Sequence, residues 1–209
     1  MNLQITDLGR TDFNKAFKLQ EETVAARKEG RVPDTLILVE HNPVYTLGRN
    51  SDLAYVLDSR EKLAKRGIDL VQTTRGGQVT YHGPGQLVGY PVISLKARKM
   101  SVLQYVEHLE KLLIEVLHKF DIESYADRKD RGVWIDGNKI AALGVRVTRH
   151  VTMHGFALNV RVNMDDYTGI IPCGIKDKGV TSLHLIKPDI TLEKVKPVLI
   201  ETFKEIFDY

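Results

Sequence analysis

The chain has 209 residues, a length that fits one large domain or two small ones. Hydrophobic residues make up 43% of the sequence and charged residues 27%, a balance typical of globular proteins that excludes disordered, fibrous and collagen-like classes. The net charge of +3 is too weak a bias to indicate nucleic acid binding.

Membrane, secretory and disulfide-scaffold classes are not supported either. Apolar runs such as Ile140 to Val145 are far shorter than the roughly 18 residues of a spanning helix. Met1 to Asp7 contains an early acid and lacks the apolar stretch of a secretory signal, so we expect a cytoplasmic protein. The one cysteine, Cys173, can form neither an intramolecular disulfide nor a cysteine-based metal cluster.

The first third of the chain is predicted to alternate strands with helices. Thr11 is the expected cap of the first helix, which Gly30 closes, and Ser59 and Gly67 bound a second, polar helix. Apolar patterns typical of strands occur at Leu3–Leu8, Leu36–Val39 and Ile68–Gln72.

A glycine-rich stretch follows, from Arg75 to Pro91. It holds 5 of the 16 glycines, which predicts irregular backbone and not a regular strand. Arg75, Gly76 and Gly77 could bind a phosphate or carboxylate through backbone amides and a guanidinium. The spacing matches neither a P-loop nor a dinucleotide-binding motif, so both of these readings fail.

The rest of the chain is predicted to contain two long helices around a strand meander. Ser101 begins the longest helix, and Thr191 begins the C-terminal one. Three strands, two of them joined by an Asp-Gly turn, are expected at Gly132–Ile135, Lys139–Thr148 and Val151–Val160. The irregular order predicts an α+β (mixed α/β) fold, with residues 1–209 as a single domain of mixed β-sheets flanked by helices.

Cys173 lies between a proline and a glycine, in a turn that would expose its sulfur to a ligand. A lone cysteine is most often a small buried hydrophobic residue, whereas a functional one is a thiolate nucleophile. The nucleophile needs a nearby cation or base. Lys139, at the start of an unusually apolar strand, is a candidate if the fold brings it close, although such a lysine alone more often faces solvent.

Two histidines, His82 and His154, each precede a glycine. Either could carry a proton or donate to a substrate carbonyl, and either could equally be a hydrogen-bonded structural residue. His150 and His154 share one face of a predicted strand, but no third ligand motif accompanies them, so we predict no metal site.

Five ordered blocks of this sequence together resemble the lipoyl(octanoyl) transferase family, also called lipoate-protein ligase B. Any one block alone would be weak evidence, but together they span roughly Pro33 to Ser182. The blocks are Glu40–Arg49, Arg75–Gln86, Gly137–Ala141, His154–Asn159 and Ile171–Gly174.

The resemblance implies a fold like the catalytic domain of biotin and lipoate protein ligases, and an acyltransferase activity. Octanoyl would pass from acyl-carrier protein to a lysine of a lipoyl domain through a thioester on Cys173, with Lys139 as its activating partner and His154 as a possible auxiliary residue. By the same resemblance, the residues lining the acyl pocket would be Arg75, Gly76, Gly77, Gln78, Val79, Thr80, Tyr81, His82, Ala142, Leu143, Gly144, Gly155, Phe156 and Ala157.

The resemblance also implies which cofactors and partners to expect. Because transfer from a thioester to an amide is downhill, no ATP, metal or other cofactor is expected, and the acyl group would arrive on the phosphopantetheine of acyl-carrier protein. The acceptors would be the lipoyl domains of 2-oxoacid dehydrogenase E2 subunits and the glycine cleavage H protein. Basic residues that could contact the acidic carrier are Lys96, Arg98 and Lys99, or Arg128, Lys129 and Arg131.

Two alternatives stay open at this point. An ATP-dependent lipoate or biotin ligase would activate its acid with ATP and form no acyl-enzyme. A catalytically silent protein would bind acyl-carrier protein or a lipoyl domain without turnover.

Overall fold

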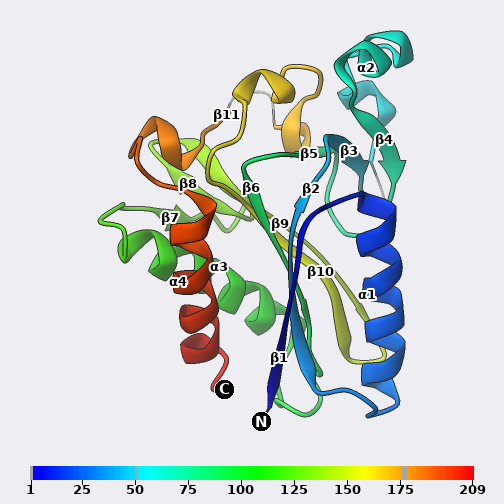
Figure 1. The fold of residues 1–209 in the computed structure, drawn as a ribbon, viewed down its shortest axis with the longest axis vertical. Helices are drawn as coiled ribbons and strands as arrows, with labels where there is room; N and C mark the ends of the chain where they lie inside the picture. Colours follow the sequence, from blue (N-terminus) through cyan, green and yellow to red (C-terminus); the bar gives the residue numbers. More distant parts are fainter. Residues whose placement is uncertain (1, 50, 176–177) are drawn as a thin grey trace.

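The computed structural model describes residues 2–49, 51–175 and 178–209, and its centre is a twisted mixed β-sheet (Figure 1). Strands β1 and β2 pair in parallel, β11 pairs in parallel with β9, and the other neighbours are antiparallel. In order across the sheet the strands are β1 (Leu3–Thr11), β2 (Asp34–His41), β6 (Gln86–Val92), β10 (Val151–Asn159), β9 (Asn138–Thr148), β8 (Val133–Ile135) and β7 (Tyr125–Ala126), with β11 (Gly179–Val180) beside β9.

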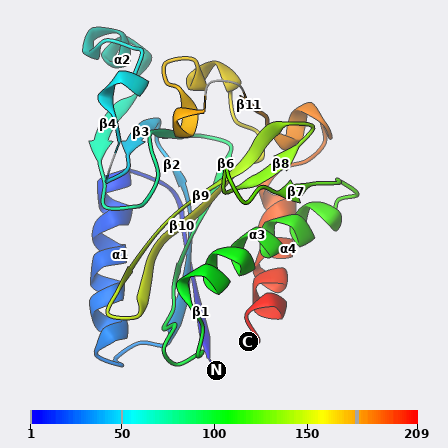
Figure 2. The same cartoon turned by 180° about the vertical axis from the view of Figure 1, so that it is seen from behind.

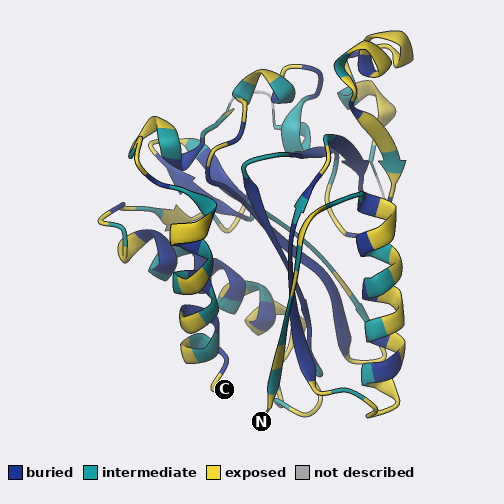
Figure 3. Cartoon of the chain, viewed as in Figure 1, coloured by how far each residue is buried: buried dark blue, intermediate teal, exposed yellow. Residues whose placement is uncertain are grey.

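Helices cover both faces of this sheet, as Figures 1 and 2 show from opposite sides. Helix α1 (Phe13–Lys28) packs on one face, and α3 (Val102–His118) and α4 (Leu192–Ile206) pack together on the other. Each helix buries one stripe of apolar residues, and the central strands are buried on both faces (Figure 3). The predicted mixed α/β fold class is therefore confirmed.

A smaller sheet lies at one end of the main one and has its own core. It contains β4 (Asp69–Gln72), β3 (Val44–Leu47) and β5 (Thr80–His82), and α2 (Arg60–Arg66) precedes β4. Tyr45, Val79 and Tyr81 are among its buried residues. Short 3-10 turns complete the fold at η1 (Leu53–Tyr55), η2 (Met164–Tyr167), η3 (Pro172–Gly174) and η4 (Leu183–Leu185).

Helix boundaries with strong local signals follow the sequence prediction. Ser59 caps α2 and Gly67 ends it at φ +63°, while Ser101 begins α3 with a reciprocal capping box. The predicted cap of α1 is wrong by one residue. Asp12 caps the helix by accepting backbone N–H bonds, because Thr11 is still paired with β2.

The predicted irregular backbone from Arg75 to Pro91 is only half correct. Residues 75–79 form a loop, but residues 80–82 form strand β5 and residues 86–92 form the fully buried strand β6. Gly89 shows why the glycine count misleads, because a side chain there would meet the ring of Phe156. Its lack of a side chain serves packing inside the sheet, not a turn.

None of the helices in the described ranges combines the length and apolarity that crossing a membrane requires.

Asp34, at the start of β2, ties distant parts of the fold together. Its buried carboxylate accepts hydrogen bonds from Arg27 Nε at 2.7 Å, Arg98 Nε at 3.2 Å and the Tyr209 hydroxyl at 2.8 Å. It also accepts the N–H of Ser94 at 3.0 Å. One carboxylate therefore connects α1, the turn after β6 and the C-terminal end of the chain.

We predict that Asp34→Ala lowers the free energy of unfolding by about 3 kcal/mol or more, because it leaves the buried Arg98 guanidinium without its carboxylate. Urea denaturation measures the change. Glu205→Ala, which removes the exposed Lys119–Glu205 pair, is the matched control and should cost less than about 1 kcal/mol. Equal effects of the two substitutions would contradict the role assigned to Asp34.

Candidate active site

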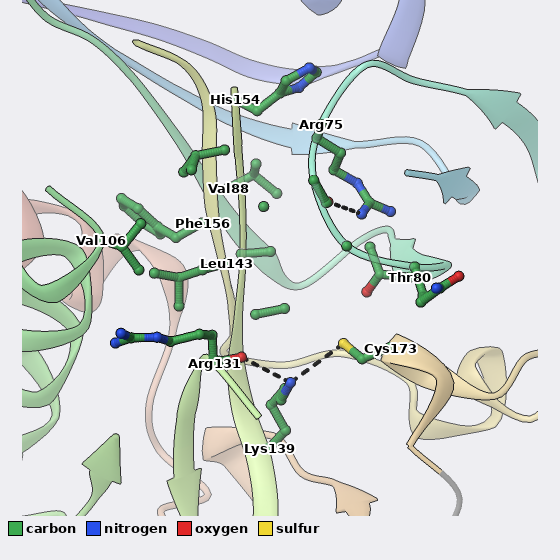
Figure 4. Close-up of a pocket in the computed structure, with 18 of the residues that line it drawn as sticks. Arg75, Thr80, Val88, Val106, Arg131, Lys139, Leu143, His154, Phe156 and Cys173 are labelled. Carbon is green, nitrogen blue, oxygen red and sulfur yellow. Dashed lines mark hydrogen bonds between the residues drawn. The ribbon is translucent and has the colours of Figure 1, made fainter. Parts of the chain in front are cut away.

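A cavity of about 370 Å³ opens between the glycine-rich loop after β4, strands β9 and β10, and the turn that carries Cys173 (Figure 4). Its volume lies within the range of small-molecule sites. Apolar walls come from Val88, Val106, Leu143 and Phe156, and Lys139 and Cys173 lie together at one end. The cavity therefore has a reactive end and an apolar interior.

Cys173 lies in a turn that the neighbouring Pro172 and Gly174 favour, but its own backbone conformation is not predictable from the sequence. Pro172 begins the turn η3, and Cys173 itself adopts φ +57°, which is uncommon for a residue with a side chain. Its N–H donates to Val79 O at 2.9 Å, which anchors the turn to the glycine-rich segment. Gly174 lets Tyr55 pack closely against the turn, since a side chain there would lie 2.9 Å from the ring.

Lys139 reaches the cysteine from β9. Its Nζ lies 3.4 Å from Cys173 Sγ and donates to Arg131 O at 3.1 Å (Figure 4). The side chain is only 6% exposed, because its stem passes close to Gly132, where a Cβ would approach Lys139 Cε to 3.1 Å. The fold thus places a buried lysine amine beside the thiol of Cys173, which is itself half-buried.

Arg75 supplies a second buried cation at the cavity wall. Its guanidinium donates to Thr46 O at 2.6 Å and to Gly76 O at 3.0 Å, so it braces the glycine-rich loop against β3. Burial lowers the pKa of Arg75 to about 10, and a negative charge on Cys173 counteracts this shift. The charged guanidinium of Arg75 therefore attracts a negative charge on the Cys173 sulfur.

Most of the residues expected to line a pocket do surround this cavity. The lining contains Arg75, Gly76, Gly77, Gln78, Thr80, His82, Ala142, Leu143, Gly144, Gly155, Phe156 and Ala157, beside Lys139, Cys173 and His154.

Val79 and Tyr81 are the exceptions and correct the expectation of a continuous lining. They are fully buried in the core of the small sheet. Side chains alternate along an extended segment, so Thr80 and His82 face the cavity while Val79 and Tyr81 face the opposite side. The main chain of Val79 still contributes through its bond to Cys173.

Strand β9 behaves differently, because consecutive residues from Ala142 to Val145 all reach the cavity. Strand β8 pairs with β9 only as far as Ala141, so the following part of β9 has a free outer edge. Gly76 N–H closes that edge further along by donating to Val145 O at 3.1 Å. Between these two contacts the cavity reaches both faces of the strand.

A group of neutral histidines borders the cavity away from Cys173. His82 Nδ1 lies 2.7 Å from Gln86 Oε1, and His154 Nε2 lies 3.1 Å from Thr74 Oγ1. Burial lowers the pKa of His154 to about 3 and that of His82 well below its ordinary value. His154 lies at the opposite end of the cavity from Cys173 (Figure 4), so the structure does not bring this proposed auxiliary residue to the sulfur.

Several lining residues were absent from the sequence expectation. Phe13 and Val106 belong to α1 and α3, and no sequence signal separates a core position of a helix from a cavity wall. The further lining residues are Phe13, Val88, Tyr90, Val106, Lys129, Asp130, Arg131, Val145 and Ile175.

Within residues 2–49, 51–175 and 178–209, no three His, Cys, Asp or Glu side chains gather closely enough to hold a metal ion.

Comparison with known proteins places the chain in a family. Residues 12–204 match the family model described as the lipoyl protein ligase A/B catalytic domain. The chain is 43% identical over 211 residues to the octanoyltransferase of Alkaliphilus metalliredigens, covering 100% of this chain and 97% of that protein. It is 44% identical over 211 residues to the octanoyltransferase of Koribacter versatilis, covering 98% and 84%. The protein belongs to the lipoyl protein ligase A/B catalytic domain family.

Solved structures agree on the fold. The crystal structure of lipoate-protein ligase A bound with ATP superposes with a TM-score of 0.81 at 17% identity, covering 100% of this chain and 86% of that one. Biotin protein ligase from Aquifex aeolicus gives 0.58 at 16% identity, covering 100% and 70%. The expected resemblance to these catalytic domains is therefore confirmed at the level of the fold.

The buried histidines predict a loss of stability in acid. Burial lowers the pKa of His41 to about 4, so between pH 6.5 and 4 the unfolded chain binds the extra proton. Stability is therefore full above about pH 6.5, and His41 alone should remove about 3 kcal/mol by pH 4. Urea denaturation across this range measures the effect. His41→Gln should flatten the pH dependence, whereas the exposed His118→Gln should not, and identical curves for both variants would contradict the assignment.

Proposed function

We propose that this protein transfers an octanoyl group from octanoyl-acyl-carrier protein to the target lysine of lipoyl domains, through a thioester on Cys173. The observation that carries the proposal is the 3.4 Å contact between Lys139 Nζ and Cys173 Sγ at the end of a largely apolar cavity. The octanoyltransferase relatives, which align over nearly the whole chain, support the choice of acyl group.

In the first half reaction, Cys173 attacks the donor thioester as a thiolate. The Lys139 ammonium and the buried Arg75 guanidinium both favour the negative sulfur. Attack forms the new carbon–sulfur bond, and collapse of the tetrahedral intermediate breaks the bond to the pantetheine sulfur. Lys139 gives its proton to that leaving thiolate and becomes a neutral amine.

In the second half reaction, the acceptor lysine attacks the acyl-Cys173 thioester as a free amine. The neutral Lys139 takes the proton that the acceptor nitrogen loses on forming the amide. The Cys173 thiolate leaves, and the Lys139 ammonium stands beside it again. The pair therefore returns to its starting state, and neither ATP nor a metal enters the balance.

Two of the nearby backbone amides are already engaged. Cys173 N–H donates to Val79 O and Gly76 N–H donates to Val145 O, so neither is free to stabilise the tetrahedral oxyanion. That donor must be another amide or side chain at the reactive end of the cavity.

The acyl chain would run from Cys173 into the apolar part of the cavity. Val88, Val106, Leu143 and Phe156 offer it an apolar surface, and burial contributes roughly 0.8 kcal/mol for each methylene. The neutral histidines keep additional charge away from its path.

The structure favours one of the two basic clusters as a contact for the acidic carrier. Lys129 and Arg131 line the cavity, and Arg128 and Lys129 are exposed beside it. Lys96 and Lys99 are exposed in the turn after β6, next to the β9–β10 hairpin, where Leu95 N–H donates to His150 O, and they do not line the cavity. Arg98 is buried against Asp34. We therefore assign the carrier contact to Arg128, Lys129 and Arg131.

The chemical proposal predicts a covalent intermediate. Incubation with octanoyl-acyl-carrier protein in the absence of ATP should add an octanoyl group to the wild-type chain, labile to hydroxylamine, by intact mass spectrometry. Cys173→Ser should carry no such hydroxylamine-labile adduct. Lys139→Met should slow acylation by about a hundredfold or more while remaining folded, because it removes the proton carrier.

Three other outcomes of these experiments would contradict the proposed function. Acyl transfer to a lipoyl domain that requires octanoic acid and ATP would replace the proposal with an ATP-dependent ligase. Binding of the carrier without any adduct or amide product would indicate a silent binding protein. Wild-type turnover in the Cys173→Ser variant would remove the thioester from the mechanism.

The docking assignment predicts a charge-dependent donor interaction. The pair of substitutions Arg128→Glu and Lys129→Glu should raise KM for octanoyl-acyl-carrier protein by about tenfold, because the acidic carrier is repelled, and the effect should shrink at high salt. Lys96→Glu with Lys99→Glu makes the same charge change as a control. Steady-state kinetics with equal effects from the two pairs would move the docking surface elsewhere.

A further inference from the structure

The indole of Trp134 contacts two lysine ammonium groups, a feature that the mechanism above does not use. Trp134 belongs to β8, is only 1% exposed, and donates from Nε1 to Asp130 O at 3.0 Å. Its ring lies 4.7 Å from Lys139 Nζ and 4.5 Å from Lys178 Nζ, measured to the ring centroid. Both distances are within the range of cation–π attraction.

For Lys139 the ring is one of three contacts made by the ammonium group. The ammonium lies against the Arg131 carbonyl, the Cys173 sulfur and the face of the indole. The negative π-face attracts the ammonium and not the neutral amine, and the attraction is stronger in a buried site. Trp134 and Lys139 are also opposite each other in the β8–β9 pairing, so the ring is rigidly placed.

Lys178, which directly precedes β11, contacts the same ring. Its Nζ bonds Asp127 Oδ2 at 2.8 Å and Asp130 Oδ2 at 2.7 Å. These bonds raise the pKa of Lys178 and lower the pKa of Asp127 to about 2, so this ion pair is charged near neutral pH. The indole therefore contacts both Lys139 of β9 and Lys178, which directly precedes β11.

We propose that Trp134 is a positioning residue for acyl transfer, whose ring holds the Lys139 ammonium in place beside the Cys173 sulfur. The same ring also contacts Lys178, which directly precedes β11. The catalytic consequence rests on the proposed function, but the effect on thiol reactivity is a property of the free protein and needs no substrate.

The single cysteine makes a direct test possible, because alkylation by iodoacetamide reports on Cys173 alone. The rate is measured against pH for wild type, Trp134→Phe and Trp134→Leu. We expect the midpoint of the rate increase to move to higher pH by about one unit in Trp134→Leu, with a smaller shift in Trp134→Phe, which keeps an aromatic face. The other charged groups around the pair stay unchanged in every variant: Arg75, Lys129, Asp130, Arg131 and Lys178.

Tyr125→Leu is the matched control. Tyr125 is paired with Trp134 across β7 and β8 but is half-exposed, and its loss should leave the midpoint in place. An unshifted midpoint in a Trp134→Leu variant with wild-type thermal stability, or an equal shift in Tyr125→Leu, would overturn the proposal. If Trp134→Leu fails to fold, Trp134→Phe takes its place: the smaller shift to higher pH supports the proposal, and an unshifted midpoint overturns it.

A further comparison separates this inference from the proposed function. Acylation by octanoyl-acyl-carrier protein should fall in the same order as alkylation at pH 7 and recover as the pH rises. Absence of wild-type acylation, together with the expected alkylation shifts, would reject the proposed donor while keeping the role of Trp134.

Discussion

The contact between the Lys139 ammonium and the Cys173 sulfur is the constraint on which the rest of the structure depends. An ammonium strengthens its hold on a thiolate as water is removed, but each buried charge also needs groups that replace its hydration. The Arg131 carbonyl and the indole of Trp134 do this for Lys139. Because Gly132 has no side chain, the lysine stem passes beside it and its amine reaches the half-buried thiol.

Several separate segments must come together for this contact to exist. Strand β9 carries Lys139, the turn η3 carries Cys173, and the glycine-rich loop receives the cysteine N–H through Val79. Each segment is tied to a neighbour by hydrogen bonds between backbone groups or by a buried cation such as Arg75. The positive φ of Cys173 is maintained because its N–H donates to Val79 O and the N–H of Gly174 donates to Ile171 O, which together define the backbone of the turn.

The same arrangement makes the cavity suitable for an apolar chain. Burial keeps His82 and His154 uncharged, and Arg75 uses its donors on Thr46 and Gly76. Strand β9 has a free edge between Ala141, where its pairing with β8 ends, and Val145, where it accepts the N–H of Gly76. This free edge gives the cavity access to both faces of the strand. The fold is shared with the solved structure of lipoate-protein ligase A bound with ATP, so the fold alone does not define the chemistry of the site.

The sequence by itself determined the elements with strong local signals, among them the capped helix after Ser101 and the Asp-Gly turn before Lys139, and its ordered blocks indicated the family. Its glycine count failed at β6, because Gly89 accommodates a neighbouring ring instead of making a turn. Only the tertiary structure decided that Val79 and Tyr81 face away from the cavity, and that Trp134 lies against Lys139. Which face of a strand lines a cavity depends on what covers the opposite face, and that is a property of packing between segments far apart in the chain.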